Sequence, residues 1–229
     1  MHTSIEYEDS HIIVAYKPAG FAAQTAAVGQ ADMVSELKNH IEGGYLGIVH
    51  RLDQPVEGLL VFGKTREAAA ALTRQLGTGT LHKHYYAVVC GVPDKAQEEL
   101  TDYIRKSSDR RAEIVPDSQA EGAGAGRAVL RYRLLRARDE KYSLLDVHID
   151  TGRFHQIRAQ LSHAGLPILG DIKYGTEQSE QMSRELSVGN VALCACELAF
   201  VHPVSRERLC FRIVPKGAVF HDFGFDFKN

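Results

Sequence analysis

The chain has 229 residues, of which 44% are hydrophobic, and its formal net charge is -2 at pH 7. This length and composition are sufficient for a sizeable core in one large domain or two small ones. No apolar run approaches the roughly 20 residues that span a bilayer, and the N-terminus is polar and acidic, so we expect a cytoplasmic protein.

The four cysteines all lie in apolar, strand-like stretches of the sequence: Cys90, Cys194, Cys196 and Cys210. We therefore expect reduced thiols that behave as small hydrophobic residues. One residue separates Cys194 from Cys196, which is too close for half of a usual zinc site. Zinc-helix, phosphate-loop and dinucleotide motifs are also missing from the sequence, so we expect neither a metal nor a cofactor.

The first half of the chain alternates between strand-like and helix-like stretches. Residues 11–18 predict a strand that ends at a proline, and residues 31–44 predict a helix with apolar residues at helical spacing and a Gly-Gly stop. Residues 58–65 predict a second strand. Residues 66–77 predict an alanine-rich helix that Thr65 caps and a glycine ends.

Strands dominate the second half of the chain. They are expected at residues 83–91, 127–142, 142–150, 191–203 and 207–215. Residues 154–165 predict a helix, and residues 176–190 predict a polar surface insertion with some helical character. Strands and helices mix without repeats or a long linker, so we expect a single α+β domain over residues 1–229.

Two stretches are locally basic although the net charge is close to zero. In residues 127–142, Arg131 and Arg133 alternate with apolar residues, which places both arginines on one side of a strand. An ordinary solvated strand face and an RNA-contacting surface both fit this pattern. Residues 105–111 form a second basic cluster on an expected loop, with the same two interpretations.

Two charged residues beside the expected core indicate a polar site. In helix 154–165, Arg158 lies next to the apolar stripe, where a guanidinium is costly to desolvate unless it meets an anion. Asp53, just before the strand at 58–65, is the partner we expect, and this pairing would keep its carboxylate ionised at neutral pH. Such an aspartate suits a nucleophile or a base. A buried ion pair or an Asx turn is the structural alternative.

Four segments carry a family resemblance in the same order along the chain. They are YEDSHIIVAYKPAG (7–20), HRLDQPVEGLLVFGKT (50–65), KHYYAVVCG (83–91) and TGRFHQIRAQLSHAGLPILGDIKYG (151–175). Together they resemble the motifs of the RluA-type RNA pseudouridine synthases. The resemblance implies a mixed, largely antiparallel sheet with flanking helices and a central cleft. It also implies an enzyme that isomerises uridine in structured rRNA or tRNA to pseudouridine without a cofactor.

The resemblance also implies roles for three catalytic residues. Asp53 matches the catalytic aspartate, which either attacks C1′ to form an ester or removes a sugar proton to form a glycal. Tyr85 matches the motif tyrosine, whose ring would lie against the base, and Arg158 matches the arginine that pairs with the aspartate. Strand alternation points Tyr86 to the opposite face. Gly58 would allow close backbone approach.

Other matched positions are expected to contact RNA. Arg51 matches the residue that fills the gap left by a flipped uridine, with a phosphate contact or a surface salt bridge as the alternatives. His50 is expected to orient the loop rather than to transfer protons. The full set of expected RNA-binding residues is Arg51, His50, Arg153, His155, Arg131 and Arg133.

The sequence departs from the family pattern at three of these motif positions. Val56 and Glu57 replace a Thr-Ser pair, and Phe154 replaces a threonine. These departures leave the identity of the RNA substrate undecided, because Glu57 near an RNA channel would repel phosphate unless it is paired. Many relatives carry a small N-terminal S4-like RNA-binding domain. Because the first motif begins at Tyr7, we do not expect one here.

Two functions of other classes compete with this interpretation. A catalytically silent RNA-binding or RNA-folding protein on the same scaffold would keep the basic surface but would not need the carboxylate. A glycosidic hydrolase usually works with two carboxylates, one as acid and one as nucleophile. No second acid in a comparable setting stands out in the sequence, because Asp171 in the segment GDIKYG is expected to be a turn residue.

Overall fold

The computed structural model describes residues 2–25 and 29–224. The chain divides into two compact units, the first made of Met1–Lys83 and Cys194–Pro215, and the second of His84–Leu193 and Lys216–Asn229. The chain therefore leaves the first unit within one strand, His82–Cys90, and returns to it within another, Leu193–Val201.

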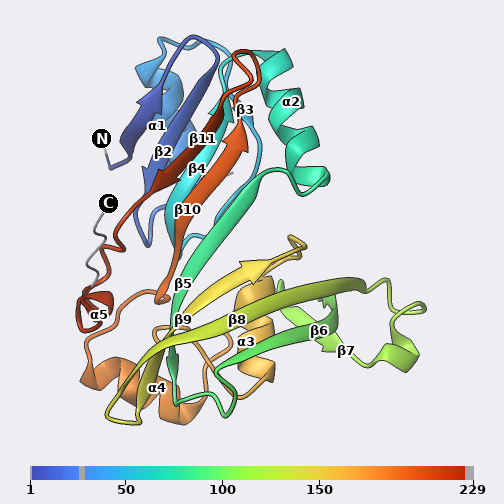
Figure 1. Cartoon of the computed structure of the whole chain (residues 1–229), viewed down its shortest axis with the longest axis vertical. Coiled ribbons are helices and arrows are strands. Elements are labelled where there is room, and N and C mark those ends of the chain that lie inside the picture. Colours follow the sequence, from blue (N-terminus) through green and yellow to red (C-terminus); the bar gives the residue numbers. More distant parts are fainter. Residues whose placement is uncertain (1, 26–28, 225–229) are drawn as a thin grey trace. The chain divides into compact units, whose positions relative to one another are not determined.

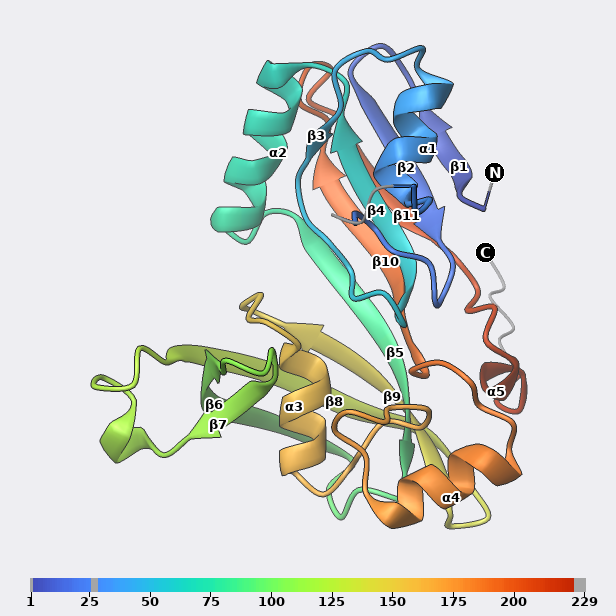
Figure 2. The ribbon, with the colours of Figure 1, turned by 180° about the vertical axis from the view of Figure 1, so that it is seen from behind.

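The first unit is a mixed sheet with one helix on each face (Figures 1 and 2). Its strands are β1 (Ser4–Glu8), β2 (Ile12–Lys17), β3 (Gly47–Ile48), β4 (Glu57–Gly63), β10 (Leu193–Val201) and β11 (Arg208–Arg212). Strand β2 lies between β1 and β4 and is antiparallel to both. Strand β10 runs parallel to β4 and antiparallel to β11. Its helices are α1 (Met33–His40) and α2 (Arg66–Gly77).

The two helices begin where the sequence supplies capping side chains. The Asp32 side chain accepts a hydrogen bond from the Ser35 backbone N–H at the start of α1. Thr65 does the same for Ala68 at the start of α2, as expected from the sequence. Each cap satisfies a backbone donor that the first helical turn leaves unpaired. Helix α2 has the predicted bounds, whereas α1 ends at His40 and is shorter than predicted.

Strand alternation divides the core of the first unit into two layers. Ile13 and Ala15 of β2 pack with Met33 and Leu37 of α1 on one face. On the other face, the alternate residues of β2 and β4 pack against α2, whose buried residues include Leu72. Strands β2 and β4 are therefore buried on both sides, which explains why both read as continuous apolar runs in the sequence.

The second unit is an antiparallel sheet with the strand order β5-β9-β8-β6-β7. Its strands are β5 (His82–Cys90), β6 (Gln97–Lys106), β7 (Ala112–Val115), β8 (Gly126–Arg138) and β9 (Tyr142–Ile149). Its helical segments are α3 (Gln156–His163), α4 (Glu177–Glu185), α5 (Ala218–His221) and the short 3-10 helix Asp117–Gln119. Ala159 of α3 packs on Ala128 of β8 and Ile104 of β6, so α3 covers one face of this sheet.

The strand register decides which residues share the face covered by α3. Tyr132 is on the same side of β8 as Ala128, and it pairs with Val147, which in turn pairs with Tyr85 of β5. Directly paired residues point to the same side of a sheet. Tyr85 therefore faces the α3 side, and Tyr86 faces the other side, as predicted.

The α+β class with a mixed, mostly antiparallel arrangement of strands is confirmed. Strands β1, β3, β6 and β7 were not predicted from the sequence. The insertion at 176–190 holds a well-capped helix, α4, with Ser179 and Ser183 buried. All four cysteines are free, but Cys210 is exposed, contrary to expectation. Among the described residues, none of the helices has the length and hydropathy of a membrane span. The single catalytic domain stays a prediction.

Candidate active site

Asp53 lies in the turn that leads into β4 of the first unit, and its side chain is half-buried. Its backbone carbonyl accepts a hydrogen bond from the Val56 N–H at 3.1 Å. The next residue, Gln54, exchanges two hydrogen bonds with Gly20: its carbonyl accepts from the Gly20 N–H at 2.9 Å, and its side-chain amide donates to the Gly20 carbonyl at 3.0 Å. The segment after β2 therefore holds the Asp53 turn in place.

A fully buried ammonium group supports the same turn from inside the unit. Lys17, at the end of β2, is 0% exposed and donates to the carbonyl oxygens of Pro18, Phe21 and Gln54 at 3.0, 2.7 and 3.0 Å. Burial lowers the pKa of Lys17 to about 8, while the negative charges of Asp53 and Glu57 act in the opposite direction. The Asp53 carboxylate thus lies in the field of a buried cation that also fixes its loop.

Glu57, one of the departures from the family pattern, is an interior residue. It is 3% exposed, and its Oε2 accepts a hydrogen bond of 2.5 Å from the Tyr16 hydroxyl. Burial raises the pKa of Tyr16, and the bond to Glu57 raises it further, so the tyrosine remains a donor. Val56 is buried as well. The Glu57 carboxylate is thus hydrogen-bonded to Tyr16 and acts electrostatically on the buried Lys17 ammonium, whose positive charge opposes the repulsion of phosphate.

His50 is a buried support for β4. It is 8% exposed, and its Nε2 accepts from the Val61 backbone N–H at 3.4 Å. Burial, and to a smaller extent the charge of Lys83, holds the pKa of His50 well below its usual value, so the ring is neutral. Its Nδ1 has no hydrogen-bond partner in the described part of the chain. Arg51, in contrast, is exposed.

Gly58 permits the close strand packing that the sequence predicted. Its φ is +134°, and a Cβ at this position would lie 2.5 Å from the backbone N and O of Ala195 in β10. Any larger residue would push β4 and β10 apart at the point where the Asp53 turn enters the sheet.

In the second unit, Arg158 of α3 forms a buried ion pair with Asp171. Its Nε donates to Asp171 Oδ2 at 2.7 Å and its Nη2 to Asp171 Oδ1 at 2.8 Å, with the two side chains 6% and 1% exposed. Asp171 is the turn residue that the sequence predicted, but it is also an arginine partner that the sequence analysis did not assign. The pairing of Arg158 with Asp53 stays a prediction.

Aromatic side chains complete the surroundings of Arg158. The ring of Tyr174 lies 5.0 Å from the guanidinium carbon. The Tyr174 hydroxyl accepts from the Ala112 N–H at 2.6 Å and lies 2.8 Å from His155 Nδ1. Phe154 stacks on His155 with 3.8 Å between ring centroids, so this departure from the family pattern adds an aromatic contact that a threonine could not make.

Three site residues lie near the start of α3 and on β5. His155 has a left-handed φ of 50° and precedes the helix, which therefore begins at Gln156, later than predicted. Arg153 is exposed, and its Nε donates to the Arg127 carbonyl at 3.1 Å. Tyr85 is 4% exposed on the face of the sheet that α3 covers.

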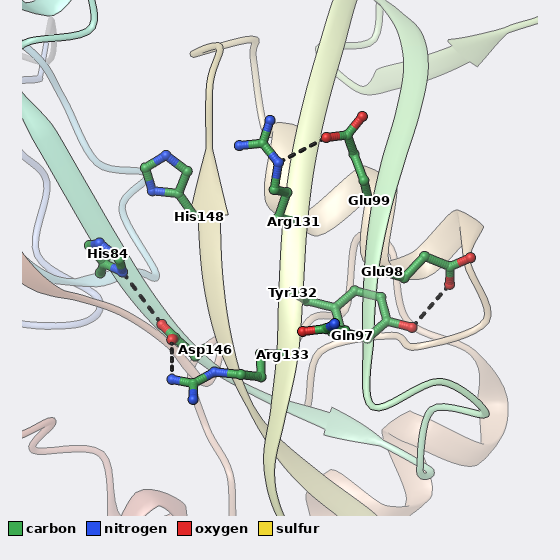
Figure 3. Close-up of a pocket in the computed structure, with 9 residues that line it drawn as sticks. All are labelled: His84, Gln97, Glu98, Glu99, Arg131, Tyr132, Arg133, Asp146 and His148. Carbon is green, nitrogen blue, oxygen red and sulfur yellow. Dashed lines mark hydrogen bonds and ion pairs between the residues drawn. The ribbon is translucent and has the colours of Figure 1, made fainter.

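Arg131 and Arg133 lie on the opposite face, in a hollow of about 490 Å³ that we call the arginine groove (Figure 3). It is lined by His84, Gln97, Glu98, Glu99, Arg131, Tyr132, Arg133, Asp146 and His148. Arg131 pairs with Glu99 at 2.8 Å and Asp150 at 2.7 Å, and Arg133 pairs with Asp146 at 3.0 Å. The strand alternation is confirmed, but cross-strand carboxylates compensate both guanidinium charges.

The expected site residues are thus distributed over both units. Asp53, His50 and Arg51 belong to the first unit, and Tyr85, Arg131, Arg133, Arg153, His155 and Arg158 belong to the second. Sequence reasoning missed the roles of Lys17 and Tyr174. A lysine at the end of an otherwise apolar run was the available signal for the first. Among the described residues, no group of three His, Cys, Asp or Glu side chains could hold a metal ion.

The sequence model described as "RNA pseudouridylate synthase" matches residues 11–163, which is more than half of the chain. The chain therefore belongs to the RNA pseudouridylate synthase family.

Similar proteins agree with this assignment. The chain is 34% identical over 219 residues to "Ribosomal large subunit pseudouridine synthase D" of Zymomonas mobilis, covering 90% of this chain and 67% of the relative. It is 31% identical to "tRNA pseudouridine synthase C" of Pectobacterium carotovorum, covering 90% and 57%. The structure "Human RNA Pseudouridylate Synthase Domain Containing 1" has a TM-score of 0.76 at 19% identity, covering 93% and 83%, and so shares the fold. The chain spans about three fifths of the length of these two curated relatives.

Proposed function

We propose that this chain isomerises uridine within rRNA or tRNA to pseudouridine, with Asp53 as the catalytic carboxylate. The observation that carries the proposal is the family match over residues 11–163, because this range contains Asp53, Tyr85 and Arg158. The names of the similar proteins include both ribosomal and transfer RNA, so the proposal extends to either substrate.

The chemistry needs one ionised carboxylate at the sugar. In the ester route, an oxygen of Asp53 bonds to C1′ while the bond from C1′ to N1 breaks, and the electron pair leaves with uracil. In the glycal route, Asp53 instead removes the C2′ proton, and the electrons of that C–H bond form the C1′–C2′ double bond while the C1′–N1 bond breaks. In both routes the ring turns and C5 bonds to C1′. The Asp53 oxygen leaves C1′ in the ester route, and C2′ takes its proton back in the glycal route. The C5 proton is then lost and N1 is protonated. Every group in this scheme belongs to the protein or to the RNA.

Two cations act on the carboxylate of Asp53 in this proposal. The first is Lys17, whose charge acts on Asp53 within the first unit. The second is Arg158. A guanidinium has five N–H donors, and the bonds to Asp171 use the Nε donor and one on Nη2. We assign a bond from another donor of this guanidinium to Asp53, the partner predicted from the sequence. Tyr85 would lie against the flipped base.

RNA contacts follow from the exposure of the basic side chains. Arg51 is exposed beside Asp53 and is suited to fill the gap left by a flipped uridine. Arg153 and His155 would bind the RNA backbone near Arg158. His50 is buried, so in this proposal it supports the loop without touching RNA. The arginine groove would be an outlying contact, weakened by its own carboxylates.

The test is pseudouridine formation in cellular RNA incubated with the purified chain, measured by mass spectrometry of nucleosides. We expect activity from the unsubstituted chain and none from Asp53→Asn, with an unchanged thermal unfolding transition. Asp94→Asn, at an exposed aspartate between β5 and β6, is the matched control and should retain activity. Full activity of Asp53→Asn would contradict the proposed chemistry. RNA binding without any pseudouridine would favour a silent RNA-binding protein on this scaffold.

A further inference from the structure

The two carboxylate oxygens of Asp171 have different partners. Oδ1 accepts hydrogen bonds from the backbone N–H groups of Lys173 and Tyr174 at 3.0 and 3.1 Å, and so closes the turn that Asp171 begins. It also accepts from Arg158 Nη2 at 2.8 Å. Oδ2 accepts from Arg158 Nε at 2.7 Å. Oδ1 therefore accepts hydrogen bonds from both the turn and Arg158, whereas Oδ2 accepts one from Arg158.

The pair is set in a rigid, nearly dry environment. The Arg158 and Asp171 side chains are 6% and 1% exposed, so little water screens their attraction. A bidentate pair of hydrogen bonds also holds the guanidinium and the carboxylate in a common plane. Tyr174 lies against the guanidinium, and its hydroxyl is anchored to the Ala112 N–H. These contacts leave the guanidinium little freedom to rotate.

We propose that Asp171 is a positioning residue, which fixes the plane of the Arg158 guanidinium and so directs its remaining donors toward the reacting carboxylate. This inference rests on the role proposed for Arg158 above. An oriented donor lowers the activation barrier, whereas the RNA is bound mostly through other groups. Loss of Asp171 should therefore reduce kcat much more than it changes KM.

Asp171→Asn separates the two roles of this residue. The asparagine carbonyl can replace Oδ1 and keep the turn, while its amide nitrogen replaces Oδ2 and opposes Arg158 Nε with a donor. We expect kcat to fall by roughly tenfold to a hundredfold, with KM for RNA changed by less than about threefold. Asp102→Asn is the matched control. Asp102 bonds Gln160 and His163 of the same helix at 2.7 and 3.0 Å, and its loss should leave kcat unchanged.

A chemical rescue experiment covers the case in which Asp171→Asn folds poorly. Arg158→Ala leaves a space beside Asp171 that a guanidinium ion can enter. We expect low, non-denaturing guanidinium concentrations to restore part of the activity of Arg158→Ala, and much less in Arg158→Ala/Asp171→Asn.

Three results would overturn the positioning role: equal rescue of the two variants, rescue of neither, or an unchanged kcat in folded Asp171→Asn. In each of these cases an active unsubstituted chain would leave the proposed function intact. An unsubstituted chain that makes no pseudouridine would overturn both proposals.

Discussion

The buried ammonium group of Lys17 donates to the backbone carbonyl of Gln54, the residue that directly follows Asp53. This bond joins the end of β2 to the turn before β4. It also places a positive charge close to the carboxylate that we propose as the catalyst. Under the proposed function, the stability of the first unit and the chemistry at Asp53 both depend on the Lys17 side chain.

Lys17 should make stability depend on pH in the alkaline range. Its pKa is about 8 in the folded protein and 10.5 when unperturbed. Between these values the unfolded chain binds more protons at Lys17 than the folded chain does, so the free energy of unfolding rises with pH. Relative to Lys17→Met, the unsubstituted chain should gain up to about 3 kcal/mol across this interval. Urea unfolding below and above the interval measures it. A constant difference between the two proteins would contradict the low pKa.

Glu57→Gln should destabilise the first unit. The substitution removes a buried negative charge that counters Lys17, and it weakens the short bond from the Tyr16 hydroxyl. We expect a loss of about 1 to 3 kcal/mol in the free energy of unfolding, measured with urea. Glu6→Gln, at an exposed position on β1, is the control and should change stability by less than about 0.5 kcal/mol. Equal effects of the two substitutions would mean that Glu57 is not a compensating charge.

Gly58→Ala should be costly, because the added methyl group would meet the backbone of Ala195 at 2.5 Å in a strained conformation. We expect a loss of roughly 2 to 4 kcal/mol in the free energy of unfolding. Gly77→Ala is the matched control, since Gly77 ends α2 and a Cβ there meets nothing within 4 Å. Alanine at that position should leave stability unchanged or raise it slightly. Thermal unfolding of both variants would show whether β4 and β10 need the glycine.

Substitutions in the arginine groove should change RNA affinity in two directions. Arg131→Ala with Arg133→Ala should weaken binding and lower the slope of log affinity against log salt by about 1 to 2. Glu99→Gln should strengthen binding, because it removes one of the carboxylates that compensate Arg131. Fluorescence anisotropy with labelled RNA over a salt series measures both effects. Unchanged affinity in all three positions would make this face ordinary solvated surface.

Much of the fold could be read from the sequence where the signal is local. The cap at Thr65 and the alanine-rich run after it predict α2 with its observed bounds, because a helix is stabilised by neighbours three and four residues apart. Strands β6 and β7 escaped prediction, because β6 has exposed polar residues along much of its length and β7 has only four residues, so neither carries a long apolar run. Such strands are held by their neighbours in the sheet rather than by their own residues.

The order of four motifs in the sequence was sufficient to indicate the family and its candidate aspartate, tyrosine and arginine. The tertiary structure decided what surrounds each of them. Pairing between distant segments brings Asp171 to Arg158, buries Lys17 against the Asp53 turn, and places carboxylates opposite Arg131 and Arg133. The physical reason is that burial and charge compensation depend on strand register and helix packing, which join residues far apart in the chain.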